Sequence, residues 1–456
     1  MSLSPLVIAA PGSGHGKTSV TLALLAALTR RGVAVTPFKV GPDFIDPGHH
    51  ALACGRASRN LDGWMCERSI VEQVFRRGCS GTEVAVVEGV MGLFDGASGS
   101  DDSGSTAQIA KWLNGRVILV VDAGRQARSA AALVKGFVDF EPHLEFAGVI
   151  FNNVASANHA ELLREALVST PGLPPLLGCL TRDSEVTLPE RHLGLLTAEE
   201  AGRDAAFFSR LADWFEAGVD VEALLENFIS AAEAVQKPAP AEGETVRIGV
   251  ARDAAFCFYY QDNLEALEAA GAELVEFSPL HDARLPDGLH GLYLGGGYPE
   301  VHAGQLTANA SLREQIRSRI AAGMPAYAEC GGLVYLCEAV DGQSMCGLLP
   351  AGARMLPRRK ALGYREVELS DDGPLGPSGT RLRGHEFHYS ELEMPSRIQR
   401  AYRVFDRKGR ELGTEGYRLH NLLASYVHLH FGSEPQVAKH LMNFMRSHAQ
   451  TVARSM

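Results

Sequence analysis

Short apolar runs alternate with helical stretches through the first half of the chain. Continuous apolar runs predict buried strands at residues 6–10, 33–40, 84–88, 117–122 and 146–151. Such runs, without polar alternation, are typical of parallel strands that helices cover on both faces. Residues 19–31 carry a helical pattern soon after the first strand. The first half of the chain therefore predicts a doubly wound α/β fold with a parallel sheet.

A second α/β pattern follows a polar segment that contains prolines. Residues 204–234 are predicted to be helical, and residues 237–244 have no periodicity, as is typical of a linker. Further strands are predicted at residues 246–251, 273–277, 291–294, 325–328 and 425–430. We therefore expect two α/β domains, 1–234 and 246–456, joined by a linker at 235–245.

Composition and charge exclude several classes of protein. The chain has 456 residues, of which 46% are hydrophobic and 21% charged, as in globular proteins. A net charge of −11, with no concentrated basic segment, argues against nucleic acid as a partner. No apolar run approaches the length of a membrane span, and the N-terminal run lacks the basic residues of a signal peptide. The eight cysteines form no C-x-x-C pair, so we expect a reduced, cytoplasmic setting without zinc or disulfides.

The segment between the first strand and the following helix is rich in glycine. It ends in Gly-Lys-Thr, as P-loops do. Gly12, Gly14 and Gly16 let backbone N–H groups curl around phosphate oxygens, and the helix N-terminus adds positive charge. Lys17 is expected to neutralise the outer phosphates and Thr18 to hold Mg²⁺. The segment therefore predicts a site for ATP with Mg²⁺.

Charged side chains lie at the ends of two further predicted strands. Lys39 and Asp43 belong to one strand end, and Glu88 to another. Because the carboxyl ends of parallel strands meet at one edge of a sheet, these groups should reach the glycine-rich loop. We expect Glu88, Asp43 and Thr18 to surround Mg²⁺. Lys39 is expected to counter a substrate carboxylate or the transferred phosphoryl group, and a helix cap or turn remains the alternative for each acid.

Other polar residues of the first half have a candidate role. Asp95 lies in a glycine-flanked loop that could close over an acceptor group. Asn152 and Asn153 end a predicted strand, where paired amide groups suit the edge of an adenine base, with a strand-to-turn role as the alternative. His49 and His50 are adjacent, so their side chains point apart, which favours a loop or substrate contact over a metal site.

In the second half, a cysteine stands at a predicted strand-to-helix turn. Cys330 is followed by two glycines, an elbow of the kind that exposes a nucleophile. The helix N-terminus should lower the thiol pKa, and the Gly331 N–H should serve an oxyanion hole. Gly296, in a second glycine-rich loop, is expected to supply another oxyanion N–H. His428 is the expected base, on the same face of the predicted strand as His430.

This set resembles the triad of class I glutamine amidotransferase domains. In those domains a glutamate stands two residues after the histidine, where this chain has His430. The sequence therefore supports a Cys330–His428 dyad, with His430 as an alternative base. A glutaminase beside a nucleotide site indicates an ATP-driven amidation, in which an acyl phosphate is attacked by ammonia from L-glutamine.

Along nearly its whole length the chain resembles the cobyrinic acid a,c-diamide synthase family. The matching segments are residues 12–18, 38–46, 59–62, 88–96, 294–300, 328–332, 384–390 and 426–431. The first half is also similar to dethiobiotin synthetase, whose acyl-phosphate chemistry agrees with this interpretation. The resemblance implies amidation of the a and c acetate groups of a corrin in cobalamin biosynthesis, dependent on glutamine and Mg·ATP.

The resemblance also implies where the corrin binds. Asp43, Ile45 and Asp46 lie in the loop expected to contact the tetrapyrrole side chains and to govern the order of amidation. The segment 358–360 and the loop predicted at 384–390 offer cationic and polar groups to a polyanionic substrate, with a solvated surface as the alternative for the basic residues. Expected partners are the corrin polycarboxylate, L-glutamine and ATP, without nucleic acid or membrane; a homodimer stays open.

Two alternative functions also stay open. The same chemistry could act on hydrogenobyrinic acid or a sirohydrochlorin, because no metal ligand set in the sequence distinguishes these tetrapyrroles. From a different class, the chain could be a P-loop switch ATPase with a degenerate glutaminase half as a docking module. Cys330 and His428 argue against that role, because a docking module needs no elbow thiol.

Overall fold

The chain folds into two compact units. The computed structural model describes residues 3–186, 190–191, 194–195, 204–228 and 245–454. The units are Met1–Gln236 and Lys237–Met456, and each contains its own hydrophobic core. The predicted linker at 235–245 lies outside the described residues, apart from Thr245. Within the described ranges, no helix is both long and apolar enough to cross a membrane.

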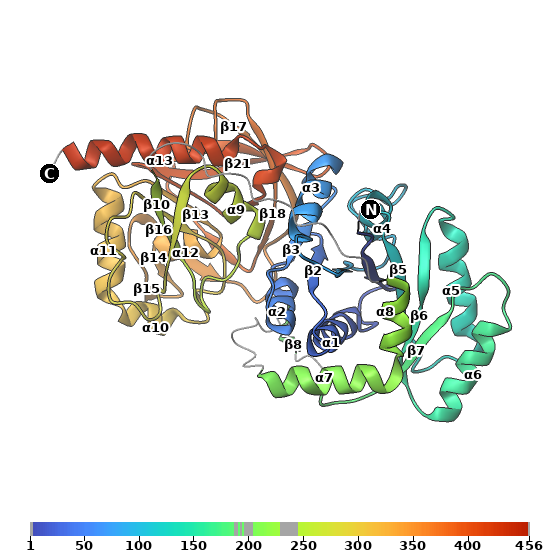
Figure 1. Cartoon of the computed structure of the whole chain (residues 1–456). Coiled ribbons are helices and arrows are strands. Elements are labelled where there is room, and N and C mark those ends of the chain that lie inside the picture. The colour runs from blue at the N-terminus through green and yellow to red at the C-terminus, as the bar shows by residue number, and fades with distance from the viewer. Residues whose placement is uncertain (1–2, 187–189, 192–193, 196–203, 229–244, 455–456) are drawn as a thin grey trace. The chain divides into compact units, whose positions relative to one another are not determined.

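The first unit is built around a seven-stranded parallel sheet with the order β3-β2-β4-β1-β5-β6-β7 (Figure 1). Its strands are β1 (Leu6–Ala9), β2 (Val35–Val40), β3 (Arg59–Leu61), β4 (Val84–Glu88), β5 (Arg116–Asp122), β6 (Glu145–Val154) and β7 (Leu176–Thr181), with a separate pair, β8 (Glu190–Arg191) and β9 (Gly194–Leu195). Its helices are α1 (Lys17–Arg30), α2 (Ile45–Cys54), α3 (Arg68–Gly78), α4 (Thr106–Trp112), α5 (Arg128–Phe140), α6 (Ala157–Val168), α7 (Ala205–Gly218) and α8 (Val221–Phe228).

The central strands β1 and β4 are buried along their whole length and are apolar apart from Glu88, as the sequence pattern predicts. All four residues of β1 and all five of β4 are buried. Helix α1 packs against α2 and α7, and α5 packs against α6. The core joins α1 and α7 to the buried strands. This doubly wound fold brings the carboxyl ends of β1, β2 and β4 together beside the start of α1.

The predicted helix at 204–234 is wrong in its extent, because α7 and α8 are separate helices. Val219 between them is extended, with φ −132° and ψ 130°. A Cβ atom at Gly218 would lie 2.4 Å from the carbonyl oxygen of Cys179, and Val219 forms a bridge to Gly178. The helix therefore ends where its backbone meets β7. Residues 229–234 lie outside the described part of the chain.

The second unit has a ten-stranded sheet with the order β11-β10-β12-β13-β22-β21-β20-β17-β18-β23. Its strands are β10 (Val246–Ala251), β11 (Ala272–Phe277), β12 (Gly291–Leu294), β13 (Ala326–Glu329), β17 (Ala361–Leu369), β18 (Arg381–His388), β20 (Gln399–Asp406), β21 (Glu411–Leu419), β22 (Leu422–Ser425) and β23 (His428–Leu429). A second sheet contains β14 (Cys337–Val340), β15 (Gln343–Ser344), β16 (Leu349–Met355) and β19 (Ser390–Leu392). The helices are α9 (Gln261–Ala269), α10 (Ala303–Ala308), α11 (Ala310–Ala321), α12 (Gly331–Leu336) and α13 (Val437–Arg454), with a 3₁₀ turn, η1, at Phe431–Ser433.

The large sheet of this unit is mixed. Strands β11, β10, β12, β13 and β22 run parallel, and the strands from β22 to β23 pair antiparallel. The apolar pattern of the sequence predicts β10–β13, misses β22 apart from Ser425, and does not predict β14–β21. The segment 384–390, predicted as a loop, is mostly strand β18.

The predicted strand at 425–430 is also wrong in its extent. Strand β22 ends at Ser425 beside β13, whereas β23 contains only His428 and Leu429 and pairs with β18. The Val427 N–H donates to the Ser425 hydroxyl at 2.9 Å, and the Tyr426 N–H donates to the Glu415 carboxylate at 2.7 Å. These hydrogen bonds turn the chain between the two strands.

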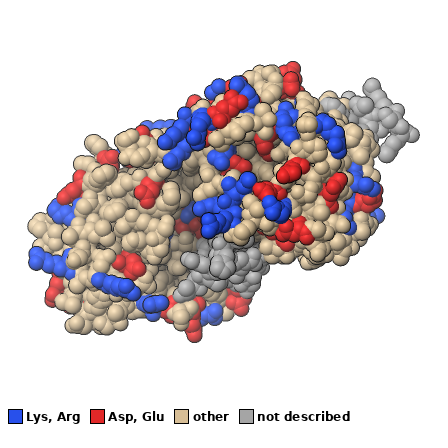
Figure 2. All heavy atoms as spheres, turned by 180° about the vertical axis from the view of Figure 1, so that it is seen from behind, with Lys and Arg blue, Asp and Glu red and all other residues tan. Residues whose placement is uncertain are grey.

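Exposed charges of both signs are mixed on the surface. Figure 2 shows Lys and Arg side chains interspersed with Asp and Glu side chains on the drawn face. Ion pairs of this kind join Arg381 to Glu366 at 3.0 Å and Arg247 to Glu273 at 3.1 Å. Such a mixture is the ordinary condition of a protein surface.

Candidate active sites

The glycine-rich loop of the first unit lies between β1 and α1. Gly14 and Gly16 have φ angles of 82° and 92°, values that favour glycine. At Gly16 a Cβ atom would also lie 2.2 Å from the side-chain amide nitrogen of Asn152. The loop is tied to β6, because this Asn152 amide donates to the carbonyl of His15 at 3.1 Å. The backbone therefore curls as a P-loop requires, with Lys17 and Thr18 opening α1.

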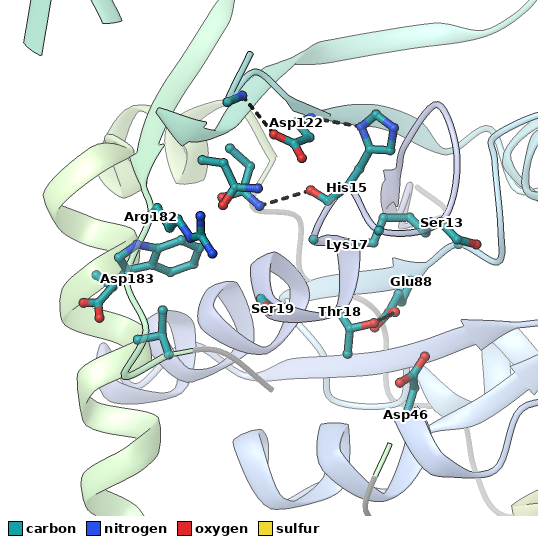
Figure 3. A pocket seen from close by; sticks show the side chains of 18 of the residues that line it. Ser13, His15, Lys17, Thr18, Ser19, Asp46, Glu88, Asp122, Arg182 and Asp183 are labelled. Atoms are coloured by element: carbon teal, nitrogen blue, oxygen red, sulfur yellow. Dashed lines mark hydrogen bonds between the residues drawn. The ribbon is translucent and has the colours of Figure 1, made fainter. Parts of the chain in front are cut away.

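A pocket of about 1130 Å³ opens beside this loop, within the first unit. Figure 3 shows Thr18 and Glu88 pointing toward one another, with Asp46 nearby and Arg182 and Asp183 at the far side. The predicted residues that line the pocket are Gly14, Gly16, Lys17, Thr18, Lys39, Asp43, Asp46, Glu88, Asn152 and Asn153. The structure thus places most of the predicted phosphate, metal and base contacts around one cavity.

A buried network of charges forms the floor of the pocket. The Lys39 ammonium lies 2.6 Å from an Asp46 oxygen and 3.0 Å from a Glu88 oxygen. Thr18 donates its hydroxyl to the same Glu88 oxygen at 2.7 Å. Lys39, Asp46 and Glu88 are all at most 4% exposed. Such a network of paired, buried charges is rigid, so its charged groups are held in position to bind a charged ligand.

The network fixes the charge of both lysines. Burial by itself lowers the Lys39 pKa, but the carboxylates of Asp46 and Glu88 outweigh it and hold the pKa above its ordinary value. Burial, together with the nearby charge of Lys39, lowers the pKa of Lys17 to about 8. Lys39 is therefore a permanent cation, whereas Lys17 can lose its proton near neutral pH.

The pKa values of the two carboxyl groups in the network, Asp46 and Glu88, are shifted in opposite directions. Burial and the charge of Glu88 raise the Asp46 pKa well above its ordinary value. Burial also acts to raise the Glu88 pKa, but Lys39 and the hydrogen bond from His50 outweigh it and lower the pKa. Glu88 therefore ionises more readily than Asp46.

The two adjacent histidines, expected in a loop, lie in helix α2. His49 and His50 are fully buried within the helix and do not lie in a loop. The Nε2 of His50 lies 2.7 Å from a Glu88 oxygen, and its Nδ1 lies 3.0 Å from the Ser58 hydroxyl. His50 is therefore a partner of Glu88. This role could not be predicted, because nothing in the local sequence pattern shows that α2 packs against β4.

The donor set of this pocket fits Mg²⁺ bound together with phosphates. The described residues contain no group of three or more His, Cys, Asp or Glu side chains that would hold a metal ion alone. Mg²⁺, however, commonly takes one or two protein oxygens and fills its remaining positions with phosphate and water. Thr18 and Glu88 already converge, and the buried Oδ1 of Asp46 accepts no hydrogen bond.

Asp43, Ile45 and Asp95 have mainly local contacts. One Asp43 oxygen accepts the Ile45 N–H at 2.8 Å, at the start of α2, although Asp43 also lines the pocket. Asp95 accepts the Gly92 N–H at 2.9 Å in the loop after β4. Asp46, rather than Asp43, contacts Lys39, so Asp46 lies closer to the phosphate site than the sequence indicates.

The far wall of the pocket was not predicted from the sequence. Thr181 ends β7, Arg182 and Asp183 follow the strand, and α7 contributes Trp214. The Trp214 indole N–H donates to the Thr181 carbonyl at 2.8 Å. Strand β7 was not predicted, so residues at its carboxyl end could not be recognised as part of a site.

In the second unit, Cys330 stands on a strained turn between β13 and α12. Its φ is 45° and its ψ is −100°, a conformation that L-residues rarely adopt. The turn is held by a hydrogen bond from the Cys330 N–H to the Ser425 carbonyl at 2.7 Å. A Cβ atom at Gly332 would lie 2.2 Å from the Leu294 carbonyl oxygen, so the turn needs glycine there. This is the strand-to-helix elbow that the sequence predicts.

The second glycine-rich loop lies against the elbow. The Gly296 N–H donates to the Phe258 carbonyl at 3.1 Å, so it is not available to an oxyanion. The backbone nitrogen of the next residue, Gly297, lies close to Gly331. A Cβ atom added to Gly331 would be only 2.9 Å from it. The β-bridge to Phe258 therefore occupies the Gly296 N–H, and the backbone nitrogen beside Gly331 is that of Gly297.

His428 and His430 lie in different surroundings. The Cε1 and Nε2 edge of His428 packs on Gly296, where an added Cβ atom would be 2.3 Å from Cε1. The His430 side chain accepts the Gly432 N–H at 3.1 Å, and its ring packs on Tyr260 with the centroids 4.8 Å apart. Of the two histidines, His428 therefore belongs to the group around Cys330.

Burial raises the pKa of the Cys330 thiol, and the charges of Glu300 and Glu386 raise it further. This direction is opposite to the expected one. Helix α12 has only six residues, so its N-terminus gives little compensation. The resting thiol therefore keeps its proton, and attack requires a base.

Strand β18 forms another wall of the cysteine site. The Cys330 sulfur lies 3.9 Å from the Phe387 carbonyl oxygen. Glu386 pairs with Arg365 at 2.6 Å and with His388 at 2.8 Å. Arg359 from the basic segment 358–360 is exposed, and its guanidinium lies 5.9 Å from the centre of the Phe387 ring. The structure thus brings the segment 384–390 to the cysteine.

Together, the fold and the two sites define a class of protein, in which a P-loop nucleotide-binding unit and a glutamine amidotransferase unit share one chain. Residues 6–196 match the CobQ/CobB/MinD/ParA nucleotide-binding domain family. Residues 247–436 match the CobB/CobQ-like glutamine amidotransferase domain family.

Full-length relatives identify the family more closely. A cobyrinate a,c-diamide synthase from Syntrophotalea carbinolica is 50% identical, over 98% of this chain and 99% of the relative. A hydrogenobyrinate a,c-diamide synthase from Streptomyces coelicolor is 45% identical, over 97% of each chain. A cobyrinate a,c-diamide synthase from Dehalococcoides mccartyi is 42% identical, over 98% of each. The chain belongs to the cobyrinate a,c-diamide synthase family of enzymes.

Proposed function

We propose that this enzyme amidates the a and c acetate carboxylates of cobyrinic acid, with ATP and L-glutamine as co-substrates. Residues 1–234 are the synthetase and residues 246–456 the glutaminase. The proposal is supported by family membership and by the two sites. The observation that carries it is the elbow cysteine, Cys330, in a chain whose other unit holds a P-loop with the buried cation Lys39.

In the first unit, the substrate carboxylate attacks the γ-phosphorus of ATP, ADP leaves, and an acyl phosphate forms. Lys17 and the P-loop N–H groups hold the phosphates. Lys39 neutralises charge on the transferred group. Thr18 and Glu88, with Asp46 or Asp43, would hold Mg²⁺, which supplies further positive charge at the phosphates. Ammonia then attacks the acyl carbon, and phosphate leaves.

In the second unit, His428 takes the Cys330 proton as the sulfur attacks the amide carbon of glutamine. The oxyanion accepts hydrogen bonds from the N–H groups of Gly331 and Gly297. The C–N bond breaks, the proton passes to the leaving nitrogen, and ammonia departs. Water then hydrolyses the thioester to glutamate.

A substrate panel tests the proposal. Cobyrinic acid and hydrogenobyrinic acid are each incubated with ATP, Mg²⁺ and glutamine, and products are identified by mass spectrometry. We expect two successive replacements of a carboxyl by an amide. Hydrogenobyrinic acid is the second candidate because the Streptomyces relative is named for it. ATP hydrolysis without amide formation on either corrin would contradict the proposal and favour a switch ATPase.

The variant Cys330→Ala separates the two half-reactions. Glutamine-dependent amidation should vanish because the nucleophile is gone. Amidation with an ammonium salt in place of glutamine should survive, because the first unit is unchanged. Glutamine-dependent turnover that persists in this variant would remove Cys330 from the mechanism.

A further inference from the structure

The residue before the nucleophile is a buried carboxylate with several hydrogen-bond donors. Glu329 ends β13 and is 1% exposed. Tyr327 donates its hydroxyl to Oε1 at 2.7 Å, and Tyr293 donates to Oε2 at 3.0 Å. The Leu429 N–H donates to Oε1 at 3.1 Å. Three donors around one buried side chain satisfy the hydrogen-bonding capacity of a carboxyl group in the protein interior.

Glu329 faces the catalytic histidine. Its Oε2 lies 3.8 Å from Nδ1 of His428, which is also 1% exposed. The other edge of the imidazole, with Cε1 and Nε2, packs on Gly296 beside the elbow. The ring is therefore oriented with Nε2 toward the glycine-rich loop and Nδ1 toward Glu329. The bond to Leu429 also fixes the short strand that carries His428.

Other charged and titratable groups near His428 and Cys330 come from three segments of the chain. His385 of β18 stacks on His428 with ring centroids 5.7 Å apart, and Glu386 lies on the same strand. Glu300 follows the glycine-rich loop, and Tyr426 precedes β23. Glu300 and Glu386 act on the thiol more strongly than Glu329 does. Glu329, by contrast, is buried, accepts three hydrogen bonds and lies near Nδ1 of His428.

We propose that Glu329 is a positioning residue for the glutaminase, in place of the acid that class I amidotransferases carry two residues after the histidine. The inference rests on the proposed function of Cys330. When His428 takes the thiol proton at Nε2, the ring becomes a cation, and the nearby carboxylate stabilises it. The proton then passes from Nε2 to the leaving nitrogen. Glu329 itself exchanges no proton in these steps and holds the ring orientation.

The variant Glu329→Gln, which keeps the shape and removes the charge, tests the role. We expect kcat for glutamine hydrolysis to fall at least about tenfold, because the variant should lose part of the rate enhancement that His428 supplies as a general base and acid. KM for glutamine and the ammonia-dependent rate should stay within about twofold, because neither depends on the imidazolium. Glu329→Asp keeps the charge but places it farther from Nδ1 of His428. Its kcat for glutamine hydrolysis should therefore lie between that of Glu329→Gln and that of the wild type.

A matched control is Tyr293→Phe with Tyr327→Phe, which removes two donors but keeps the carboxylate. We expect it to retain most of kcat. A loss equal to that of Glu329→Gln would mean that the tyrosine hydrogen bonds are what matters, and would overturn the proposal. If Glu329→Gln fails to fold, Glu329→Asp tests the positioning role instead. A wild-type kcat in Glu329→Asp would overturn the proposal.

Coupling to His428 distinguishes positioning from a purely structural role. The rate of Cys330 alkylation by a chloroketone analogue of glutamine is measured in a double-mutant cycle with His428→Asn. Glu329→Gln should slow alkylation in the wild-type background and have no further effect when His428 is absent. Equal slowing in both backgrounds would contradict the proposal. A wild-type enzyme that hydrolyses no glutamine would instead refute the proposed function of Cys330.

Discussion

At the scale of single residues, the two lysines of the nucleotide pocket differ in how firmly they hold their charge. Lys39 lies among three carboxylates and remains protonated. Lys17 is mostly buried, donates to the carbonyls of Gly12 and Met91, and has its pKa lowered to about 8. Because phosphates favour the charged form, nucleotide binding should restore the proton to Lys17 at alkaline pH.

This contrast predicts the pH dependence of nucleotide binding. Below about pH 7, Lys17 is charged already, so binding should exchange no proton at this residue. Above pH 8 the free enzyme has a neutral Lys17, so binding should take up a proton and weaken by up to about tenfold per pH unit. Calorimetry in buffers of different ionisation enthalpy measures the uptake.

Lys17→Arg is the matched control for that experiment. Arginine stays charged throughout this range, so no proton uptake is expected between pH 8 and 9. Uptake of the same size in the variant would assign the titration to another group, and the low Lys17 pKa would be wrong.

At the scale of elements, the short strand β23 depends on a close approach to β18. Gly384 pairs with Leu429, and His385 with His428. A Cβ atom at Gly384 would lie 2.0 Å from the carbonyl oxygen of His428, which is backbone and cannot swing aside. The position of His428 therefore depends on a glycine far away in the sequence.

Gly384→Ala should displace β23 from β18. We expect glutamine-dependent amidation to fall at least about tenfold and the free energy of unfolding to drop by about 1–3 kcal/mol, the usual cost of overpacking. Ammonia-dependent amidation should persist, because the synthetase unit is unchanged. Activity assays with both nitrogen sources and denaturant unfolding measure these effects.

Gly352→Ala in β16 provides the comparison, because no atom lies within 4 Å of an added Cβ there. It should leave both activities near wild type. If the two variants behave alike, the loss would reflect the general effect of alanine for glycine in a strand, and not the contact with His428.

At the scale of the whole molecule, each unit has its own core and its own candidate site. Nucleotide should therefore stabilise the first unit alone. At a concentration of 100 times Kd, binding should raise its free energy of unfolding by about 2.7 kcal/mol. Amide hydrogen exchange, followed by mass spectrometry, should show protection within residues 3–186 and little change within 245–454.

Two controls accompany this experiment. A chloroketone glutamine analogue, which attaches to Cys330, should protect amides of the second unit instead. Equal protection of both units by nucleotide alone would contradict independent ligand stabilisation.

The sequence by itself determined the class of fold and the grouping of most candidate site residues. Apolar runs specify strands that are buried on both faces, and the charged or glycine-rich residues at their carboxyl ends must meet at one edge of the sheet. For this reason Lys17, Lys39 and Glu88 could be grouped from the order of residues along the chain. Cys330 could be placed at an elbow, because a strand, two glycines and a helix are local signals.

Only the tertiary structure decided which side chains complete the sites. The partners of Glu88 and His428, namely His50 and Glu329, come from elements whose packing leaves no local pattern in the sequence. The split of 425–430 into two strands, and the use of the Gly296 N–H by Phe258, likewise depend on distant backbone. Long-range contacts also set the balance of burial and charge, and this is why the Cys330 pKa moved opposite to the direction that its helix predicts.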